Sequence, residues 1–304
     1  MKRSLAVLTL FLLVLVVAQS KEQRVINISA PDGSRSGNLR NGPWTFDGGK
    51  PGGVIGRVKD LTINSTKATL SAPDGKTMQE AEGQRVATFD GNIAVKRDRM
   101  TATGPKLTYR ESDGKGILEG NARMMQQPRK QGDDPVEVNA PTMTFEVDTN
   151  ISTSSGGVSL KNGNQEGRSD QVYYEEDKAL AIFNDDQEVV LVRKRQGKGD
   201  LTIRAKEIRS LTDDKRLLAT GGITLVDGDI TTTGAQVLYN DNTGIAIVTA
   251  GRVGSQNVPA RSVNAKERSN LQGNALQHNV NRSQVQALSQ RPTLPVNDFK
   301  KIGE

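Results

Sequence analysis

The chain contains no cysteine and only one histidine among its 304 residues. It therefore has no disulfides, no thiol nucleophile and no set of His and Cys ligands for zinc. The one histidine, His278, lies in a polar stretch near the C-terminus, where we expect it at the surface. No Ser-His-Asp arrangement is predicted in the body of the chain. These absences favour a non-enzymatic protein without a metal or a cofactor.

Aromatic residues make up only 4% of the chain, and positive charge is not spread along it. Residues 252–304 hold eight basic and three acidic residues, whereas residues 19–251 hold 31 and 32. A nucleic-acid-binding protein would carry a basic patch interleaved with aromatic residues, so we expect no nucleic-acid partner. The basic C-terminal segment has two interpretations, a solvated tail or a contact with anionic lipid or another subunit.

Long apolar runs are absent except for one at the N-terminus. Lys2 and Arg3 precede an unbroken apolar run, Leu5–Ala18, which ends in a small residue. This order is typical of a secretory signal peptide cleaved after Ala18. A retained membrane anchor is the alternative, although the run is shorter than the ~20 residues that span a bilayer. We therefore expect export to the periplasm or cell envelope.

Three similar segments recur in the body, beginning at Gly91, Gly157 and Gly222, which are 66 and 65 residues apart. Each has an apolar-x-apolar pair, a polar stretch, and a second apolar pair that ends in tyrosine. Weaker copies lie between them, so the unit is a half-repeat of roughly 30 to 36 residues. The apolar residues alternate with polar ones over four to six positions, as on one face of a β-strand.

The repeats predict an all-β protein. Asp227-Gly228 and Asn162-Gly163 are typical of tight hairpin turns, which favour a long assembly of antiparallel strands. A parallel β-solenoid is the structural alternative, because it is also built from short strands punctuated by glycine. We divide the chain into a signal peptide, a Gly/Pro-rich leader, the repeats and a polar basic tail that is disordered or an arm for a partner. The ranges are 1–18, 19–53, 54–281 and 282–304.

Charged clusters coincide with predicted turns, where aspartate commonly caps backbone groups. We assign four acidic clusters to turns, although paired carboxylates also occur in glycosidases and calcium sites. Basic clusters at 96–97 and 193–195 are predicted hairpin tips, with phosphate contact as the alternative. The acidic clusters are Asp133-Asp134, Glu175-Glu176-Asp177, Asp185-Asp186 and Asp213-Asp214.

The half-repeat resembles the OstA-like repeat of lipopolysaccharide-transport proteins. The segment from Ala102 to Met125, ATGPKLTYRESDGKGILEGNARMM, carries the pattern best, and the resemblance extends over roughly residues 67–273. It implies an elongated antiparallel β-jellyroll, a folded-over sheet or β-taco, whose apolar interior shields the acyl chains of lipopolysaccharide or another envelope lipid. It also implies head-to-tail assembly with partner jellyrolls or with further copies of the chain, and no catalytic residues.

An acyl chain needs a continuous apolar trough, because each buried methylene contributes about 0.8 kcal/mol. The inward residues of the aligned repeats are the candidate lining, with a dry packed core as the alternative for each of them. Two other functions stay open: a structural or adhesive surface β-solenoid, and a polysaccharide-cleaving β-helix enzyme. The candidate lining residues are Ile93, Val95, Leu107, Tyr109, Phe145, Val158, Leu160, Tyr174, Ile182, Ile223, Leu225, Tyr239 and Ile247.

Overall fold

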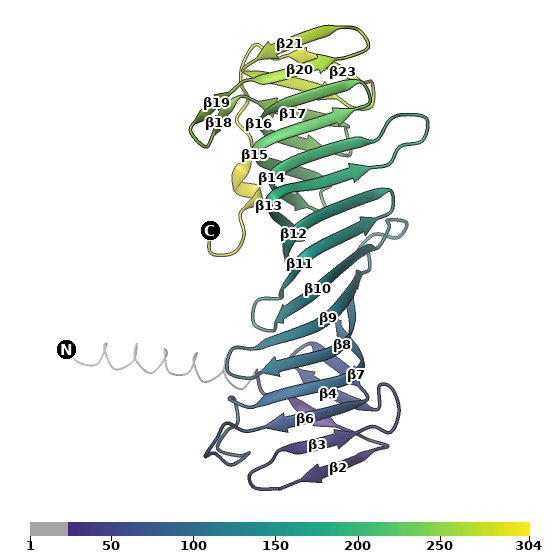
Figure 1. Cartoon of the computed structure of the whole chain (residues 1–304), viewed down its shortest axis with the longest axis vertical. Coiled ribbons are helices and arrows are strands. Elements are labelled where there is room, and N and C mark those ends of the chain that lie inside the picture. The colour runs from purple at the N-terminus through teal and green to yellow at the C-terminus, as the bar shows by residue number, and fades with distance from the viewer. Residues whose placement is uncertain (1–23) are drawn as a thin grey trace, which may run out of the picture. The chain divides into compact units, whose positions relative to one another are not determined.

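The computed structural model describes residues 24–304, and the predicted signal peptide lies outside them. Within this range the chain forms β-strands joined by turns, and its one helix is the short 3-10 helix η1, Val296–Phe299. No helix in this range has the length and apolar character needed to cross a bilayer. The predicted all-β class is thus confirmed (Figure 1).

The chain divides into two compact units rather than one continuous body. The first unit runs up to Gln127 and includes Pro141–Ile151, and the second comprises Pro128–Ala140 and Ser152–Glu304. The predicted leader contributes three strands to the first unit. The strands of the first unit up to Gln127 are β1 (Asn27–Ser29), β2 (Ser34–Gly37), β3 (Trp44–Asp47), β4 (Val54–Val58), β5 (Leu61–Ser65), β6 (Lys67–Ser71), β7 (Val86–Arg97), β8 (Met100–Arg110) and β9 (Lys115–Gln126).

Two strands, β10 (Val136–Glu146) and β11 (Ile151–Asn162), contribute residues to both units. The remaining strands belong to the second unit. They are β12 (Gln165–Glu175), β13 (Leu180–Arg193), β14 (Leu201–Leu211), β15 (Arg216–Asp227), β16 (Ile230–Asn240), β17 (Ile245–Thr249), β18 (Gly251–Val253), β19 (Gln256–Val258), β20 (Ala260–Asn264), β21 (Ser269–Gly273), β22 (Ala275–Asn279) and β23 (Gln284–Ala287).

Successive long strands pair antiparallel, as Figure 1 shows for β13, β14 and β15. The β7–β8–β9 meander and the β14–β15–β16 meander have the same arrangement. Asp227-Gly228 and Asn162-Gly163 stand at hairpin connections, as predicted. The alternative of a parallel solenoid is therefore wrong for the described residues.

The long strands bend near their middles, where bulges or irregular registers interrupt the ladders. In β7, Gly91 and Asn92 oppose a single residue of β8, and both have positive φ angles. In β15, Gly221 and Gly222 oppose one residue of β16, again with positive φ. Glycine enters this region without a steric penalty, and a bulge bends its strand sharply. The glycines that mark the repeats are thus bend points inside strands of 11 to 14 residues, not the starts of short strands.

Each bend lets the sheet fold over on itself. The first half of β7, Val86–Asp90, pairs with β6, whereas residues 94–96 in its second half pair with β5. In the second unit, β16 pairs with β20 through residues 230–233 and with β17 through residues 236–240. A strand whose two halves continue into different neighbours belongs to two layers at once. This is the folded-over sheet that the family resemblance implies.

The C-terminal residues correct the expectation of a disordered tail. Residues 294–304, which we call the strap, return to the second unit and pack on β13, β14 and β15. Phe299 is fully buried in a cluster formed with Leu180, Ile182, Leu211 and Leu218. The strap is ordered because one aromatic anchor removes a large apolar area from water.

One acidic cluster lies elsewhere than predicted, and one basic cluster stands at its predicted hairpin but is partly buried. Asp185 and Asp186 sit in the bulge of β13, between the paired residues Asn184 and Val189, instead of in a hairpin turn. Arg97 ends β7 but is only 1% exposed, and its guanidinium donates a hydrogen bond to the carbonyl of Glu146. The bulge tolerates aspartate because it leaves ladder positions unpaired.

Candidate functional site

The register of the strands defines an inner face in each unit. Residues paired directly across an antiparallel ladder point to the same side of the sheet. In the first unit, Phe89 pairs with Leu107 and Val95 with Ala102, and all four are fully buried. These pairs lie on opposite sides of the bend in β7, so both halves of the strand direct apolar side chains inward.

The second unit repeats this arrangement along a longer row. Phe183, Ile208, Ala219, Val237 and Val248 pair in succession across five strands, and all are buried. A parallel row contains Ala181, Leu217, Tyr239 and Ala246 and continues to the imidazole of His278. The inner face is therefore apolar over most of its strands and becomes polar near the end.

Ten of the thirteen candidate lining residues are buried, and the other three are partly exposed. Burial is required of a packed core and of a closed trough alike, so the assignment to lipid stays a prediction. The buried residues are Ile93, Val95, Leu107, Tyr109, Phe145, Val158, Ile182, Ile223, Leu225 and Tyr239, and the partly exposed residues are Leu160, Tyr174 and Ile247.

Two of these residues lie on the outer face. Ile182 pairs with Arg209, and Ile247 pairs with Leu238, whose neighbour in β15 is Leu218. The inner residues alternate with them, so Ile182 and Ile247 point away from the interior. Ile182 is nevertheless only 3% exposed, because the strap covers it.

The tyrosines of the repeat have partners for their hydroxyl groups. The hydroxyl of Tyr109 donates a hydrogen bond of 2.7 Å to the carbonyl of Arg24, and that of Tyr239 donates one of 2.8 Å to Asp241. Burial, followed by the nearby charge of Glu111, raises the pKa of Tyr109. Each tyrosine thus fills the interior with its ring while its polar end is satisfied at the rim.

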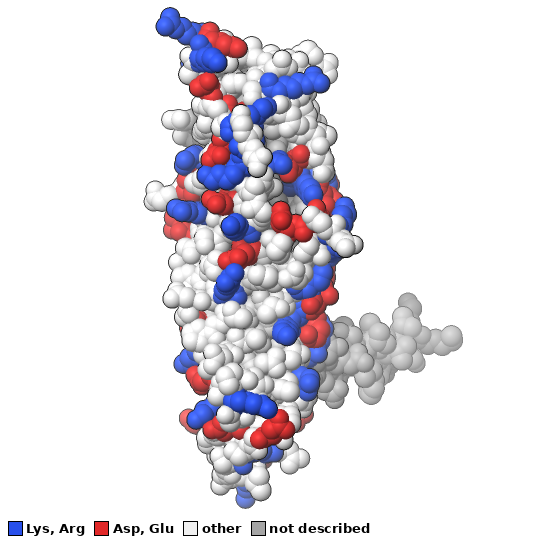
Figure 2. Space-filling view, turned by 90° about the vertical axis from the view of Figure 1, so that its right-hand side faces the viewer, with Lys and Arg blue, Asp and Glu red and all other residues white. Residues whose placement is uncertain are grey.

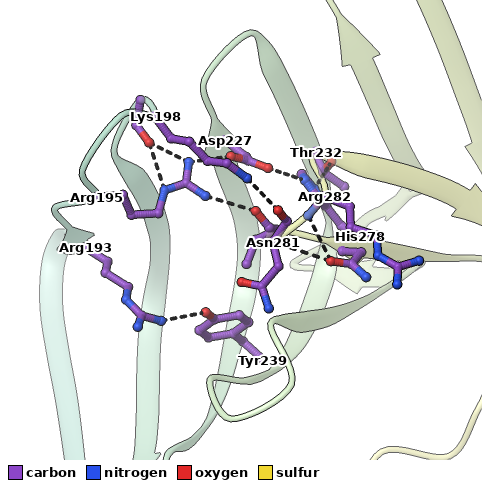
Figure 3. Close-up of polar contacts among 12 residues, drawn as sticks. Arg193, Arg195, Lys198, Asp227, Thr232, Tyr239, His278, Asn281 and Arg282 are labelled. Atoms are coloured by element: carbon purple, nitrogen blue, oxygen red, sulfur yellow. Dashed lines mark hydrogen bonds and ion pairs between the residues drawn. The ribbon is translucent and has the colours of Figure 1, made fainter.

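A buried polar cluster closes the inner face of the second unit, and it corrects the expectation for His278 (Figure 3). His278 is 0% exposed; its Nε2 lies 3.0 Å from Asp227 and its Nδ1 lies 3.1 Å from Thr232. Arg195 forms an ion pair with the other carboxylate oxygen of Asp227 and donates a hydrogen bond of 3.1 Å to the carbonyl of Val280. A buried carboxylate requires such partners to offset its lost hydration.

Opposing effects set the ionisation of Asp227. Burial raises its pKa, but the hydrogen bonds from His278 and Arg195, together with the positive charge of Arg195, outweigh burial and lower the pKa overall. The carboxylate is therefore ionised at neutral pH. The sequence contained a signal for this burial, because Leu276, His278 and Val280 alternate with polar residues as one face of a strand does.

The surface charge is mixed in sign. On the face that Figure 2 presents, Lys and Arg side chains are interspersed with Asp and Glu rather than gathered into a basic patch. Opposite charges also form ion pairs on the described residues, as in Arg129 with Asp213 and Arg204 with Glu188. In residues 24–304, no group of His, Cys, Asp and Glu side chains is arranged to hold a metal ion.

One protein family matches part of the chain. Residues 51–150 match the family described as LptA/(LptD N-terminal domain) LPS transport protein. Among solved structures, the chain is similar to LptH, the LptA homologous periplasmic component of the lipopolysaccharide transport device of Pseudomonas aeruginosa. That match has 14% identity and a TM-score of 0.36, and it covers 44% of this chain and 95% of LptH. No curated protein matches significantly.

The family match covers most of the first unit. It includes the bent strands β7, β8 and β9 and the point in β7 where its two halves pair with different strands, β6 and β5. The repeats of the sequence resemble the same family, and the segment from Ala102 to Met125 that carries the pattern best lies inside the matched range. Residues 51–150 of this chain are thus similar to the LptA/(LptD N-terminal domain) family of LPS transport proteins, as the repeats predict.

Proposed function

We propose that this protein is a non-catalytic lipid carrier of the cell envelope that shields acyl chains of lipopolysaccharide, or of a related lipid, inside its folded-over sheets. The observation that carries the proposal is that both halves of each bent strand direct apolar side chains to the same interior. Phe89 and Val95 of β7 are an example, since both are 0% exposed on opposite sides of the bend.

The energetics suit an acyl ligand. Burying a twelve-carbon chain contributes on the order of 10 kcal/mol, at about 0.8 kcal/mol for each methylene. Aliphatic and aromatic side chains without unpaired polar atoms provide the surroundings that such a chain needs. Glycines on these strands make room for the large side chains themselves, since an added Cβ at Gly56 would lie 2.6 Å from Phe89 and one at Gly104 would lie 2.9 Å from Leu118.

Export to the periplasm and assembly with other jellyrolls belong to the same proposal. Among the described residues, four strands pair with a neighbour along one edge only. They are β1 and β2 in the first unit, and β21 and β23 in the second. Free strand edges expose unpaired N–H and C=O groups, and strand addition satisfies them. Pairing of unlike edges on different molecules would give open head-to-tail chains.

Association is measurable by itself. Sedimentation over a concentration series should show chains of growing length as the concentration rises. A single monomeric species up to high concentration would rule out the head-to-tail assembly while leaving the lipid-binding proposal intact.

Lipid binding is tested with matched charge substitutions. Ile223→Asp and Leu160→Asp put a carboxylate among the methylenes, while Thr224→Asp adds the same charge to the outer face of β15. With a fluorescent twelve-carbon fatty acid as probe, we expect Ile223→Asp and Leu160→Asp to weaken binding at least about tenfold, because a buried charge costs more than 1.4 kcal/mol. Thr224→Asp should bind as the unmodified chain does.

Leu160 is only partly buried, so its variant keeps the test valid if Ile223→Asp fails to fold. Folding is checked by circular dichroism before each titration. Folded Leu160→Asp and Ile223→Asp proteins that bind the probe as tightly as Thr224→Asp would show that these residues do not line the site.

A further inference from the structure

The inner face of the second unit changes from apolar to polar along one row of paired residues. Leu191, Ile203 and Leu225 occupy this row in β13, β14 and β15. The next two positions are Thr232 in β16 and Ser262 in β20, which are 0% and 4% exposed. An acyl chain gains nothing from hydroxyl groups, so the interior near these last strands suits a different part of a ligand.

A groove opens at this place, between the β20–β21 hairpin and the β22–β23 hairpin. It has a volume of about 600 Å³, and most of the residues that line it have amide or hydroxyl side chains. Ile230, Leu271 and Val285 are its apolar members, and Arg282 and Glu267 are the charged members among the described residues that line it. The polar lining includes Ser262, Asn264, Ser269, Gln277, Gln284 and Gln286.

The buried cluster described above holds one hydroxyl of this lining in place. The Ser262 hydroxyl lies 3.0 Å from that of Thr232, which in turn contacts the ring of His278. His278 is fixed on its other side by Asp227, and Asp227 by Arg195 (Figure 3). A chain of hydrogen bonds from a buried carboxylate to the lining is a fixed polar scaffold and not a packed apolar core.

We propose that this groove binds a neutral, hydroxyl-rich ligand, namely an oligosaccharide such as the sugar portion of a glycolipid. Amide and hydroxyl side chains both donate and accept hydrogen bonds, as sugar hydroxyls do. The charge of Arg282 is balanced by that of Glu267, so the lining does not favour an anion such as phosphate. The inference rests on the proposed function and extends it, since the apolar interior then takes acyl chains and the groove takes sugar.

The test separates the sugar from the acyl chains. The saccharide of lipopolysaccharide is prepared without acyl chains, half of it is treated with phosphatase, and each form is titrated calorimetrically into the full mature chain. A Ser262→Ala/Ser269→Ala double variant removes two hydroxyls of the lining, on residues of the β20–β21 hairpin that point to the same side of the sheet. Ser255→Ala is the matched control, because Ser255 is an exposed serine of the turn between β18 and β19, outside the groove.

We expect the phosphatase-treated saccharide to bind the unmodified chain and to bind the double variant about tenfold more weakly, as the loss of two neutral hydrogen bonds predicts. The control should bind as the unmodified chain does. The proposal is overturned by a lack of binding to the treated saccharide, by binding that requires its phosphates, or by equal affinity in the double variant and the control.

The fatty-acid titration keeps the two proposals apart. A chain that binds the fatty acid but no saccharide contradicts the groove alone. A chain that binds the treated saccharide but no fatty acid contradicts the acyl-shielding function and leaves a saccharide-binding protein.

Discussion

Removing the aromatic ring of Phe299 should release the strap from the second unit. Phe299 is 0% exposed and is surrounded by Leu180, Ile182, Leu211 and Leu218. It is the one large apolar side chain of the strap that is fully buried, since Ile302 remains 63% exposed. Polar contacts add to this anchor, notably two hydrogen bonds of 2.6 and 2.9 Å from Arg209 to Glu304.

The magnitude follows from the two ways in which the protein can respond. A Phe→Ala change in a closed core costs about 3 to 5 kcal/mol, including the cavity that remains. The strap can instead detach, so the measured loss is limited to the free energy that holds it in place. A loss of about 3 kcal/mol raises the equilibrium constant for strap opening by about two orders of magnitude.

Hydrogen exchange measured by mass spectrometry reports this opening directly. In Phe299→Ala, peptides from the strap should exchange about a hundredfold faster, and peptides from β14 and β15 should keep most of their protection. Ile302→Ala is the matched control on the same segment and should leave the exchange of both regions unchanged. Equal protection of the strap in the Phe299 and Ile302 variants would refute the claim that Phe299 anchors it.

Three further measurements test the polar contacts of both units. Asp227→Asn removes the charge that compensates Arg195, and we expect a loss of about 3 kcal/mol in the free energy of unfolding, measured with urea; a loss below 1 kcal/mol would contradict a paired buried charge. Tyr109→Phe should cost about 1 kcal/mol, because it removes one hydrogen bond to a backbone carbonyl. The hydrogen bond from Arg209, followed by that from the backbone N–H of Lys301, lowers the pKa of Glu304 to about 2. The Glu304 carboxylate therefore contributes fully to strap binding above about pH 4.5, and this contribution is lost as the pH falls toward about 2. The amide resonance of Lys301, whose N–H donates to Glu304, should shift only as the pH falls toward about 2, and a shift centred near the ordinary value of 4.5 would contradict the bond.

The antiparallel repeats could be predicted because alternation and Gly-marked turns are local signals. Ile93, Val95, Leu107 and Tyr109 are all fully or almost fully buried, as expected for one face of alternating strands. The bends were harder to recognise, since a glycine at a bulge and a glycine at a turn have the same local signature. Only the pairing on both sides of Gly91 distinguishes the two.

The outward direction of Ile182 could not be predicted from the sequence for a different reason. Leu180, Ala181, Ile182 and Phe183 are apolar without alternation, because the strap covers one face of β13 and the interior occupies the other. A run of this kind does not show which residues point inward. The strap lies more than 100 residues away in sequence, so no local pattern in β13 indicates that it covers this face.

His278 was misplaced because a polar side chain suggests a surface, although the alternation around it indicated burial. Its burial depends on Asp227 and Thr232, which lie 51 and 46 residues away in the sequence. No spacing rule links the three residues. Only the pairing of β16 with β20 and of β17 with β22 brings their strands together.

The most direct test of lipid carriage is native mass spectrometry of the mature chain, purified without detergent from an envelope that contains lipopolysaccharide. The account predicts a protein mass increased by an acylated lipid, with the adduct reduced in Leu160→Asp and retained in Thr224→Asp. A folded protein recovered without any acylated lipid, and unable to take up lipopolysaccharide added afterwards, would contradict the central claim.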